Sequence, residues 1–287
     1  MAARVERALP NPLTFGRYLM RRIGFGFEAL GRQISFYART LADCVLVIPR
    51  HPGEVFRIIS DITWGSGALI VGAGTAGVIF FMSFITGGLV GLEGFKGLEL
   101  IGAQSFSGFV SAFGNTREIT PIIAGVTLAA QVGAGFTAEL GAMRINDEID
   151  ALEVMAIPTR RYLVSSRVVA ALVAITPLYL ISLFASYIAT QIAVVRLQGL
   201  SAGTFAHYFA LFLPPVDVFF SLVKAWVFAI VVAMIHCYYG YNATGGPVGV
   251  GTAVGRAIRT SIVAINVIDF GLSALMWGIS ETVRIAG

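Results

Sequence analysis

The chain has 287 residues, of which 56% are hydrophobic and 13% are charged, and its mean hydropathy is +0.81. This composition excludes a soluble globular domain of this length. The net charge of +4 does not indicate nucleic-acid binding, because the basic residues lie in the N-terminal segment and the polar loops, where the positive-inside rule places them. We therefore expect an integral membrane protein.

The N-terminal segment, residues 1–62, carries nine arginines among apolar residues that recur three and four positions apart. Phe15, Leu19 and Ile23 illustrate this spacing. It predicts amphipathic helices that lie in the headgroup layer; an ordinary cytosolic tail is the alternative. Residues 1–11 are polar and no short apolar run with a cleavage site follows them, so we expect no secretory signal peptide.

Long apolar runs without strand-like alternation predict an all-α protein with one five-span domain, residues 63–287. The first run is rich in glycine, which permits close helix contact, and Pro177 is expected to kink the third. Residues 93–115 are expected to form a mixed loop with a short helix along the membrane face. The predicted spans cover residues 65–92, 116–143, 162–195, 215–239 and 254–281.

A polar interruption at residues 145–156 separates the second and third spans. Asn146 or Asp147 is a suitable N-cap and Pro158 ends the segment, which predicts a short amphipathic helix. Its apolar face is formed by Ile145, Ile149, Leu152 and Met155, and its carboxylates are Asp147, Glu148, Asp150 and Glu153.

Most arginines fall on one side of the predicted spans, together with this helix. The positive-inside rule therefore predicts a cytoplasmic N-terminus, a cytoplasmic helix at 145–156 and an external C-terminus.

Ionisable residues within the predicted spans are candidates for a substrate path, because charge in hydrocarbon is costly. Arg117 and Glu118 either bind a lipid head group or anchor the span at the interface. Lys224 either snorkels outward or pairs with Asp217, and Asp269 is expected to pair with a polar group on a neighbouring helix. Glu139 is expected to bridge to Arg144 or Arg256.

Catalytic and nucleotide-binding motifs are not found: there is no GxSxG, HExxH, CxxC or Walker sequence, and the three histidines are scattered. A GxGxxG match at residues 72–77 lies inside an apolar run and is discarded. We expect no enzyme, no metal and no cofactor in this chain. Active transport then needs an ion gradient or a separate ATPase, and a cytoplasmic helix between two spans suits an ATPase partner.

The run of residues 137–144, its continuation through 147–156, and then Pro158 and Arg161 resemble the signature of the MlaE/YrbE family of ABC lipid-transport permeases. The resemblance covers about residues 55–283 and is most similar to YrbE subunits of actinobacterial Mce systems. Two positions depart from the family pattern: Gln131 stands where an arginine is common, and Pro247 with Val248 replaces a commoner Ala-Glu.

The resemblance implies a permease dimer in a bacterial inner membrane, two cytoplasmic ATPase subunits that hydrolyse the ATP, MCE-domain proteins on the outer face, and a lipid or fatty-acid-like substrate. The two departures suggest a second, different permease chain as the partner. An ion-coupled or passive lipid carrier and a membrane scaffold for MCE proteins are the alternative functions.

Three groups of site residues follow. Glu139 and Arg161 are expected to anchor the coupling helix, and the lipid path is assigned to Arg117, Glu118, Lys224 and Asp269. The residues expected to couple to the ATPase are Arg144, Ile145, Asp147, Glu148, Ile149, Asp150, Leu152, Glu153 and Met155.

Overall fold

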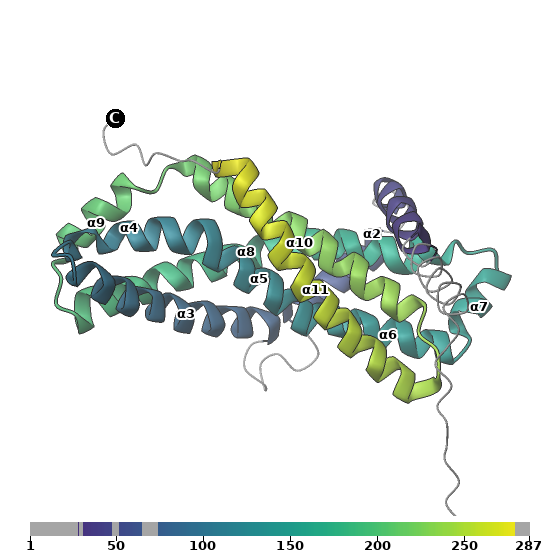
Figure 1. Cartoon of the computed structure of the whole chain (residues 1–287). Helices are drawn as coiled ribbons and strands as arrows, with labels where there is room; N and C mark the ends of the chain where they lie inside the picture. Colours follow the sequence, from purple (N-terminus) through teal and green to yellow (C-terminus); the bar gives the residue numbers. More distant parts are fainter. Residues whose placement is uncertain (1–27, 29–30, 48–51, 65–73, 279–287) are drawn as a thin grey trace, which may run out of the picture.

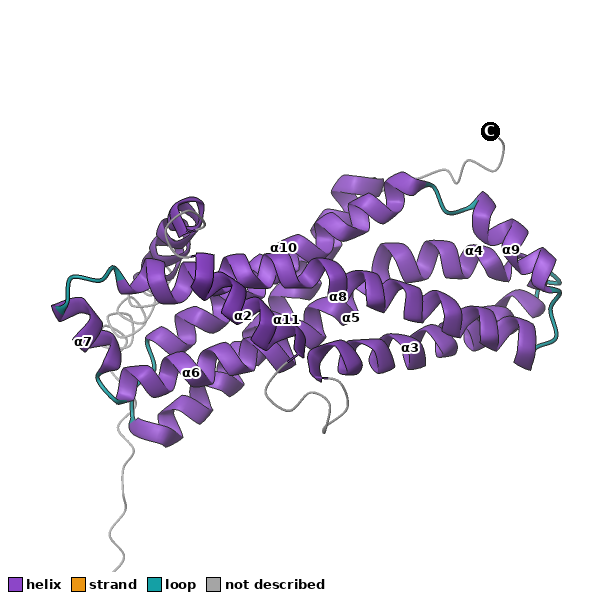
Figure 2. Ribbon diagram, turned by 180° about the vertical axis from the view of Figure 1, so that it is seen from behind, coloured by secondary structure: helices purple, strands orange, loops and turns teal. Residues whose placement is uncertain are grey.

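The computed structural model describes residues 28, 31–47, 52–64 and 74–278, and these residues form a bundle of helices without strands (Figures 1 and 2). The all-α class predicted from the sequence is confirmed. The expected amphipathic helices within residues 1–27 and the first part of the first span, 65–73, lie outside the described residues, as do the last residues of the fifth span.

Two helices precede the bundle: one covers residues 31–47, and α2 covers Pro52–Trp64. α2 packs against α8 through Val55, Ile58 and Ile62, which are buried, whereas Phe56 is exposed. Apolar residues three and four apart place this stripe on one face of the helix. The location of these helices at a membrane interface remains a prediction.

Five helical segments among the described residues are long and apolar enough to cross a membrane. The first is α3, Gly74–Glu99, and the last two are α10, Pro215–Tyr241, and α11, Gly246–Trp277. The second runs from Gln104 to Ile145 through η1 (Gln104–Phe106), α4 (Ser107–Val110), η2 (Ser111–Ile119), α5 (Thr120–Leu128), η3 (Ala129–Gly133) and α6 (Ala134–Ile145). The third comprises η4 (Arg160–Ser165), α8 (Ser166–Gln191) and η5 (Ile192–Leu197).

The expected loop at residues 93–115 is wrong. α3 continues to Glu99 and the second helix begins at Gln104. Glu93, Lys96 and Glu99 are exposed at the end of α3. Ser107, Ser111 and Asn115 are buried on the second helix, where Asn115 donates a hydrogen bond of 2.8 Å to Thr190. A buried polar side chain is tolerated in a helix once it has such a partner.

The structure also changes two other element assignments. α11 begins at Gly246, earlier than predicted, with Pro247 in its first turn, where the missing N–H of proline costs no helical hydrogen bond. Pro177 lies inside α8, and the kink expected there stays a prediction. A short helix between the third and fourth spans, α9, Ala202–Leu211, was not predicted.

α3 packs closely and extensively against α8. Ser83 and Ser182 share a hydrogen bond of 2.5 Å, and Thr190 donates one of 2.7 Å to the Gly87 carbonyl. A side chain at Gly87 would place its Cβ 2.5 Å from the Ser186 carbonyl oxygen, so only glycine allows this approach. The predicted role of the small residues in close packing is confirmed at this position.

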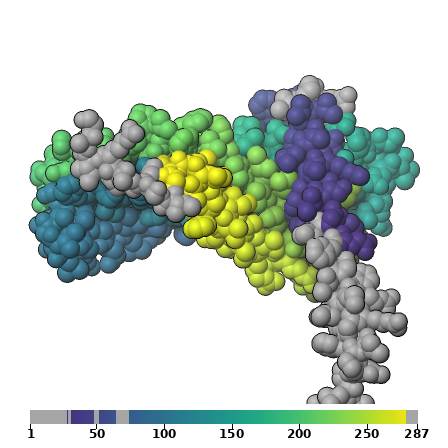
Figure 3. Space-filling view, turned by 45° about the horizontal axis from the view of Figure 1, so that its top comes forward, coloured from purple at the N-terminus to yellow at the C-terminus, as the bar shows by residue number. Residues whose placement is uncertain are grey.

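The bundle has two distinct ends and a peripheral last helix. α7, Glu148–Val154, lies at one end, and α9 lies at the other (Figure 1). α8 is central and packs on α2, α3, α5 and α10, whereas α11 crosses one face of the molecule at the surface (Figure 3).

Candidate lipid site and coupling helix

A buried cluster of charges joins the second, fourth and fifth spans. The Nζ of Lys224, which is fully buried, lies 2.6 Å from Asp269 and 3.3 Å from Glu118. Lys224 also donates hydrogen bonds of 2.7 Å to the Arg117 carbonyl and 2.8 Å to Ser273. Two carboxylates and two neutral acceptors therefore satisfy a charge that would be costly in hydrocarbon.

Three of the four residues assigned to the lipid path thus meet in one cluster. The expected pairing of Asp269 with a polar group on a neighbouring helix is confirmed. The suggested pairing of Lys224 with Asp217 is wrong, because Lys224 lies between α11 and η2 and reaches Glu118 and Asp269 instead.

Arg117 forms a second ion pair next to this cluster. Its Nε lies 2.8 Å from Asp217, which also accepts a hydrogen bond of 2.9 Å from Trp277. The guanidinium carbon lies 4.1 Å from the ring centre of Phe113, a cation–π distance. Asp217 belongs to the site although sequence reasoning did not assign it there; its position near the mouth of the fourth span was the available signal.

A pocket of about 340 Å³ opens beside these charges, between η2 and α11. Arg117 and Glu118 lie on its wall within the π-helical segment η2, a type of helix that often occurs at functional sites. Aromatic side chains complete the wall, so the pocket combines charge with apolar surface. Its lining residues are Phe113, Arg117, Glu118, Phe270, Ser273, Ala274, Trp277 and Gly278.

At the opposite end, α7 is shorter than predicted and is bounded by two non-glycine residues in the left-handed region, Asp147 (φ 59°) and Ala156 (φ 60°). Asp147 precedes the helix, but its side chain makes no capping hydrogen bond. Aspartate tolerates this conformation better than alanine does. The sharp turns at both ends orient α7 as a separate element between α6 and η4.

The apolar face of α7 is directed differently from the expectation. Ile149 is fully buried in the core of this chain, and Leu152 packs partly against the same core. The side chain of Ile149 therefore offers no surface to the expected ATPase in this structure, whereas Leu152 is only partly buried and its coupling role stays a prediction. Val154 and Met155, with 88% and 62% of their surfaces exposed, are the apolar residues left for a partner.

Polar contacts hold α7 in place. Arg144 lies 2.5 Å from Asp150, and Glu153 accepts hydrogen bonds of 3.0 Å from both Thr159 and Tyr241. These contacts link the short helix to α6, to the start of the third span and to the end of α10. The carboxylates Asp150 and Glu153 therefore have partners within the chain.

The two predicted anchoring residues have different partners. Glu139 pairs with Arg167 on α8 at 3.0 Å, and not with Arg144 or Arg256 as expected. Arg161, together with Arg160, binds Asp43 of the helix at 31–47, at 3.0 and 2.8 Å. The start of the third span is thereby tied to the N-terminal helix, a contact that only the folded chain shows.

The clamp formed by Asp43, Arg160 and Arg161 makes stability dependent on pH. Burial of Asp43 favours protonation, but the hydrogen bonds from the two arginines outweigh it and hold the pKa of its carboxyl below the ordinary value. The stabilisation is therefore present above about pH 4, the unfolded-state pKa, and is lost as pH falls through the lower folded-state pKa.

We expect Asp43→Asn to lower the free energy of unfolding by about 1–2 kcal/mol at neutral pH, allowing for the partial exposure of the arginines. Thermal unfolding of the solubilised protein at a series of pH values measures this difference. The free energies of unfolding of the variant and of the unsubstituted protein should become equal in acid. The control is Glu28→Gln in the exposed pair Glu28–Arg32. If the stability difference caused by Asp43→Asn stayed unchanged at low pH, Asp43 would not be the source of the pH dependence.

Comparison with known proteins identifies the family. The family model described as Permease MlaE matches residues 65–275. The chain belongs to the MlaE permease family. This membership confirms the resemblance to the MlaE/YrbE family as a whole, and together with the five apolar helices it establishes a multi-pass membrane protein.

Relatives of this MlaE-family chain carry transporter names. A probable ABC transporter permease protein of Rickettsia bellii is 30% identical over 209 residues, which cover 73% of this chain and 81% of that protein. Another, of Synechocystis sp., is 33% identical over 200 residues, covering 68% and 76%. The chloroplastic protein TRIGALACTOSYLDIACYLGLYCEROL 1 of Arabidopsis thaliana is 28% identical over 206 residues, covering 72% and 59%.

Proposed function

We propose that this chain is the permease subunit of an ABC-type lipid transporter, in which it forms half of the lipid passage. The pocket beside Arg117 and Glu118 is the observation that carries this proposal. A lipid head group is charged or polar and its chains are apolar, and the pocket offers both kinds of surface within the spans. The name of the Arabidopsis relative, which contains that of a glycolipid, supports a lipid substrate.

The energy for transport comes, in this proposal, from a cytoplasmic ATPase that docks on α7. Val154 and Met155 are exposed apolar residues at the end of α7, and the first turn of this helix carries the carboxylates of Glu148 and Asp150. Ile149 and the contacts of Asp150 and Glu153 hold α7 rigidly on the spans, so that displacement of α7 moves the spans with it. A second permease chain completes the passage, and MCE-domain proteins receive or deliver the lipid outside.

One experiment tests both halves of the proposal with reciprocal variants. Met155→Glu should weaken ATPase capture by about tenfold, equivalent to about 1.4 kcal/mol, and leave co-purified lipid unchanged. Ala274→Trp, which fills the pocket, should reduce co-purified lipid and leave ATPase capture unchanged. Affinity purification of the tagged full chain, followed by quantification of ATPase and lipid, measures both.

Retention of normal lipid by Ala274→Trp would remove the lipid assignment, and normal ATPase capture by Met155→Glu would remove the docking assignment. Leu100, which is exposed at the opposite end of the bundle, supplies the control Leu100→Glu. Lipid movement that continues when ATP hydrolysis is blocked would favour the ion-coupled or passive carrier instead.

A further inference from the structure

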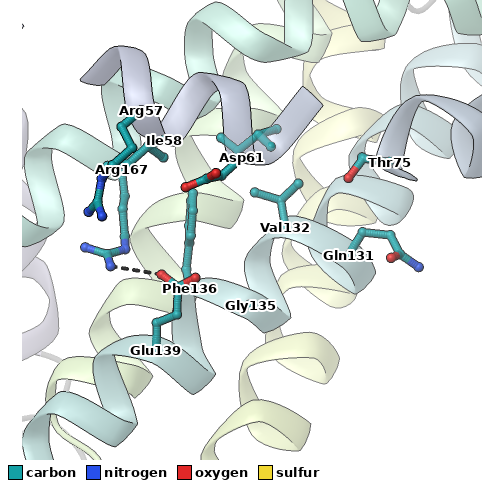
Figure 4. Close-up of a pocket in the computed structure, with 11 residues that line it drawn as sticks. Arg57, Ile58, Asp61, Thr75, Gln131, Val132, Gly135, Phe136, Glu139 and Arg167 are labelled. Carbon is teal, nitrogen blue, oxygen red and sulfur yellow. Dashed lines mark hydrogen bonds and ion pairs between the residues drawn. The ribbon is translucent and has the colours of Figure 1, made fainter. Parts of the chain in front are cut away.

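A second cavity, of about 250 Å³, lies between α2, the beginning of α3, α6 and α8 (Figure 4). It shares no lining residue with the pocket beside Arg117. Glu139 and Arg167, which line it, lie on α6 and at the start of α8, the helices on either side of α7 in the chain. It is therefore a separate site, and nothing in the proposed lipid passage uses it.

The cavity contains a buried cation with unused hydrogen-bonding capacity. Arg167 is only 5% exposed, and its guanidinium donates to the Leu163 carbonyl and to Glu139. Its Nε is buried and has no hydrogen-bond partner among the described residues. Because Nε has almost no accessible surface, a ligand in the cavity would be bound by the remaining N–H groups of Nη1 and Nη2, each of which uses only one N–H in the bonds above.

The charges around Arg167 are balanced. Arg57 on α2, whose Nη2 lies 2.6 Å from Glu54, is the second cation, and Asp61 and Glu139, the partner of Arg167, are the two carboxylates (Figure 4). Gln131, one of the two departures from the family pattern, contributes a neutral amide. Two cations and two anions in one cavity suit a ligand that carries both signs of charge.

We propose that this cavity binds the zwitterionic head group of a membrane phospholipid. The phosphate binds Arg167 and Arg57, because guanidinium groups match phosphate oxygens. The ammonium binds Asp61 and Glu139. At about 250 Å³ the cavity is smaller than sites for whole drug-sized ligands, so it holds the head group and leaves the acyl chains outside.

The position of α2 favours a lipid over a soluble ligand. α2 carries Glu54, Arg57 and Asp61, while Val55 and Ile58 are buried against the core of the bundle; its place in the headgroup layer is the prediction made from the sequence of the N-terminal segment. At that predicted location, a cavity lined by α2 would face phospholipid head groups. Phe56, which is exposed, adds apolar surface on the same helix.

Gly135 allows the cavity to be filled without disturbing the fold. It lies on α6 and lines the cavity, and a Cβ at this position would meet nothing within 4 Å. Gly97 on α3 has the same free surroundings and does not line the cavity. Gly135→Leu is therefore the test variant and Gly97→Leu its matched control.

The experiment counts phosphatidylethanolamine molecules retained by the full-length protein in mixed micelles, by native mass spectrometry. Both variants are made in the Ala274→Trp background, so that the pocket beside Arg117 does not contribute. Gly135→Leu should retain about tenfold less phosphatidylethanolamine than Gly97→Leu. Equal retention by the two would overturn the proposal, whatever the Ala274→Trp variant shows about the lipid passage.

Head-group chemistry is tested with further ligands. Phosphatidylethanolamine should bind more tightly than phosphatidylglycerol, which lacks the ammonium, and than diacylglycerol, which lacks the phosphate. Asp61→Asn, at an exposed position, should abolish the preference for phosphatidylethanolamine over phosphatidylglycerol. Soluble phosphoethanolamine that displaces the lipid at equal concentration would show a site for a soluble anion and overturn the lipid assignment.

Discussion

Replacing Lys224 with methionine should lower the free energy of unfolding by about 3–5 kcal/mol, the range for breaking a buried ion pair from one side. Methionine keeps the length and the apolar stem of lysine. It removes the charge that compensates Asp269 and Glu118, which lie 2.6 and 3.3 Å from the lysine Nζ. Thermal or denaturant unfolding of the solubilised protein measures the loss.

A double variant separates charge from packing. Asp269→Asn removes one of the two carboxylates left without a cation, so the variant with both substitutions should recover a large part of the lost stability. Coupling of this kind is expected only for residues in direct contact. If the two substitutions were simply additive, the ion pair would not be the source of the effect.

Replacing Gly87 with alanine should destabilise the protein by about 1–3 kcal/mol, the usual range for overpacking. The new Cβ would lie 2.5 Å from the Ser186 carbonyl oxygen and 2.6 Å from its Cα. Both atoms belong to the backbone of α8, so no side chain can rotate away and the two helices must separate. The same unfolding measurement detects the loss.

Gly88 is the matched control, since its Cβ would come no closer than 4.0 Å to any neighbour, Ala189. Gly88→Ala should be neutral or should stabilise the helix by about 0.5–1 kcal/mol, because alanine has the higher helix propensity. Equal effects of the two substitutions would show that helix propensity, and not the α3–α8 contact, decides the outcome at Gly87.

Sequence patterns predicted correctly those elements whose physical cause lies in neighbouring residues. All five membrane helices were predicted from apolar runs long enough to span a bilayer. The many glycines of the first span predicted close helix packing, which the structure has at Gly87. The polar interruption between the second and third spans predicted a short helix, which is present as α7. Errors arose at polar segments such as residues 93–115, because burial of polar side chains depends on partners from other helices.

The composition and periodicity of the chain by themselves determined a five-span helical membrane protein with a polar helix between two spans. The thickness of the hydrocarbon core sets the length of each apolar run, and the helical period sets the spacing of apolar residues, so both can be read from residues close together in the sequence. Tertiary structure alone decided which charges meet. Lys224 pairs with Asp269 and Glu118, Arg117 with Asp217, and Glu139 with Arg167. These partners come from different helices, and their separation in space depends on how whole helices pack, which no local pattern specifies.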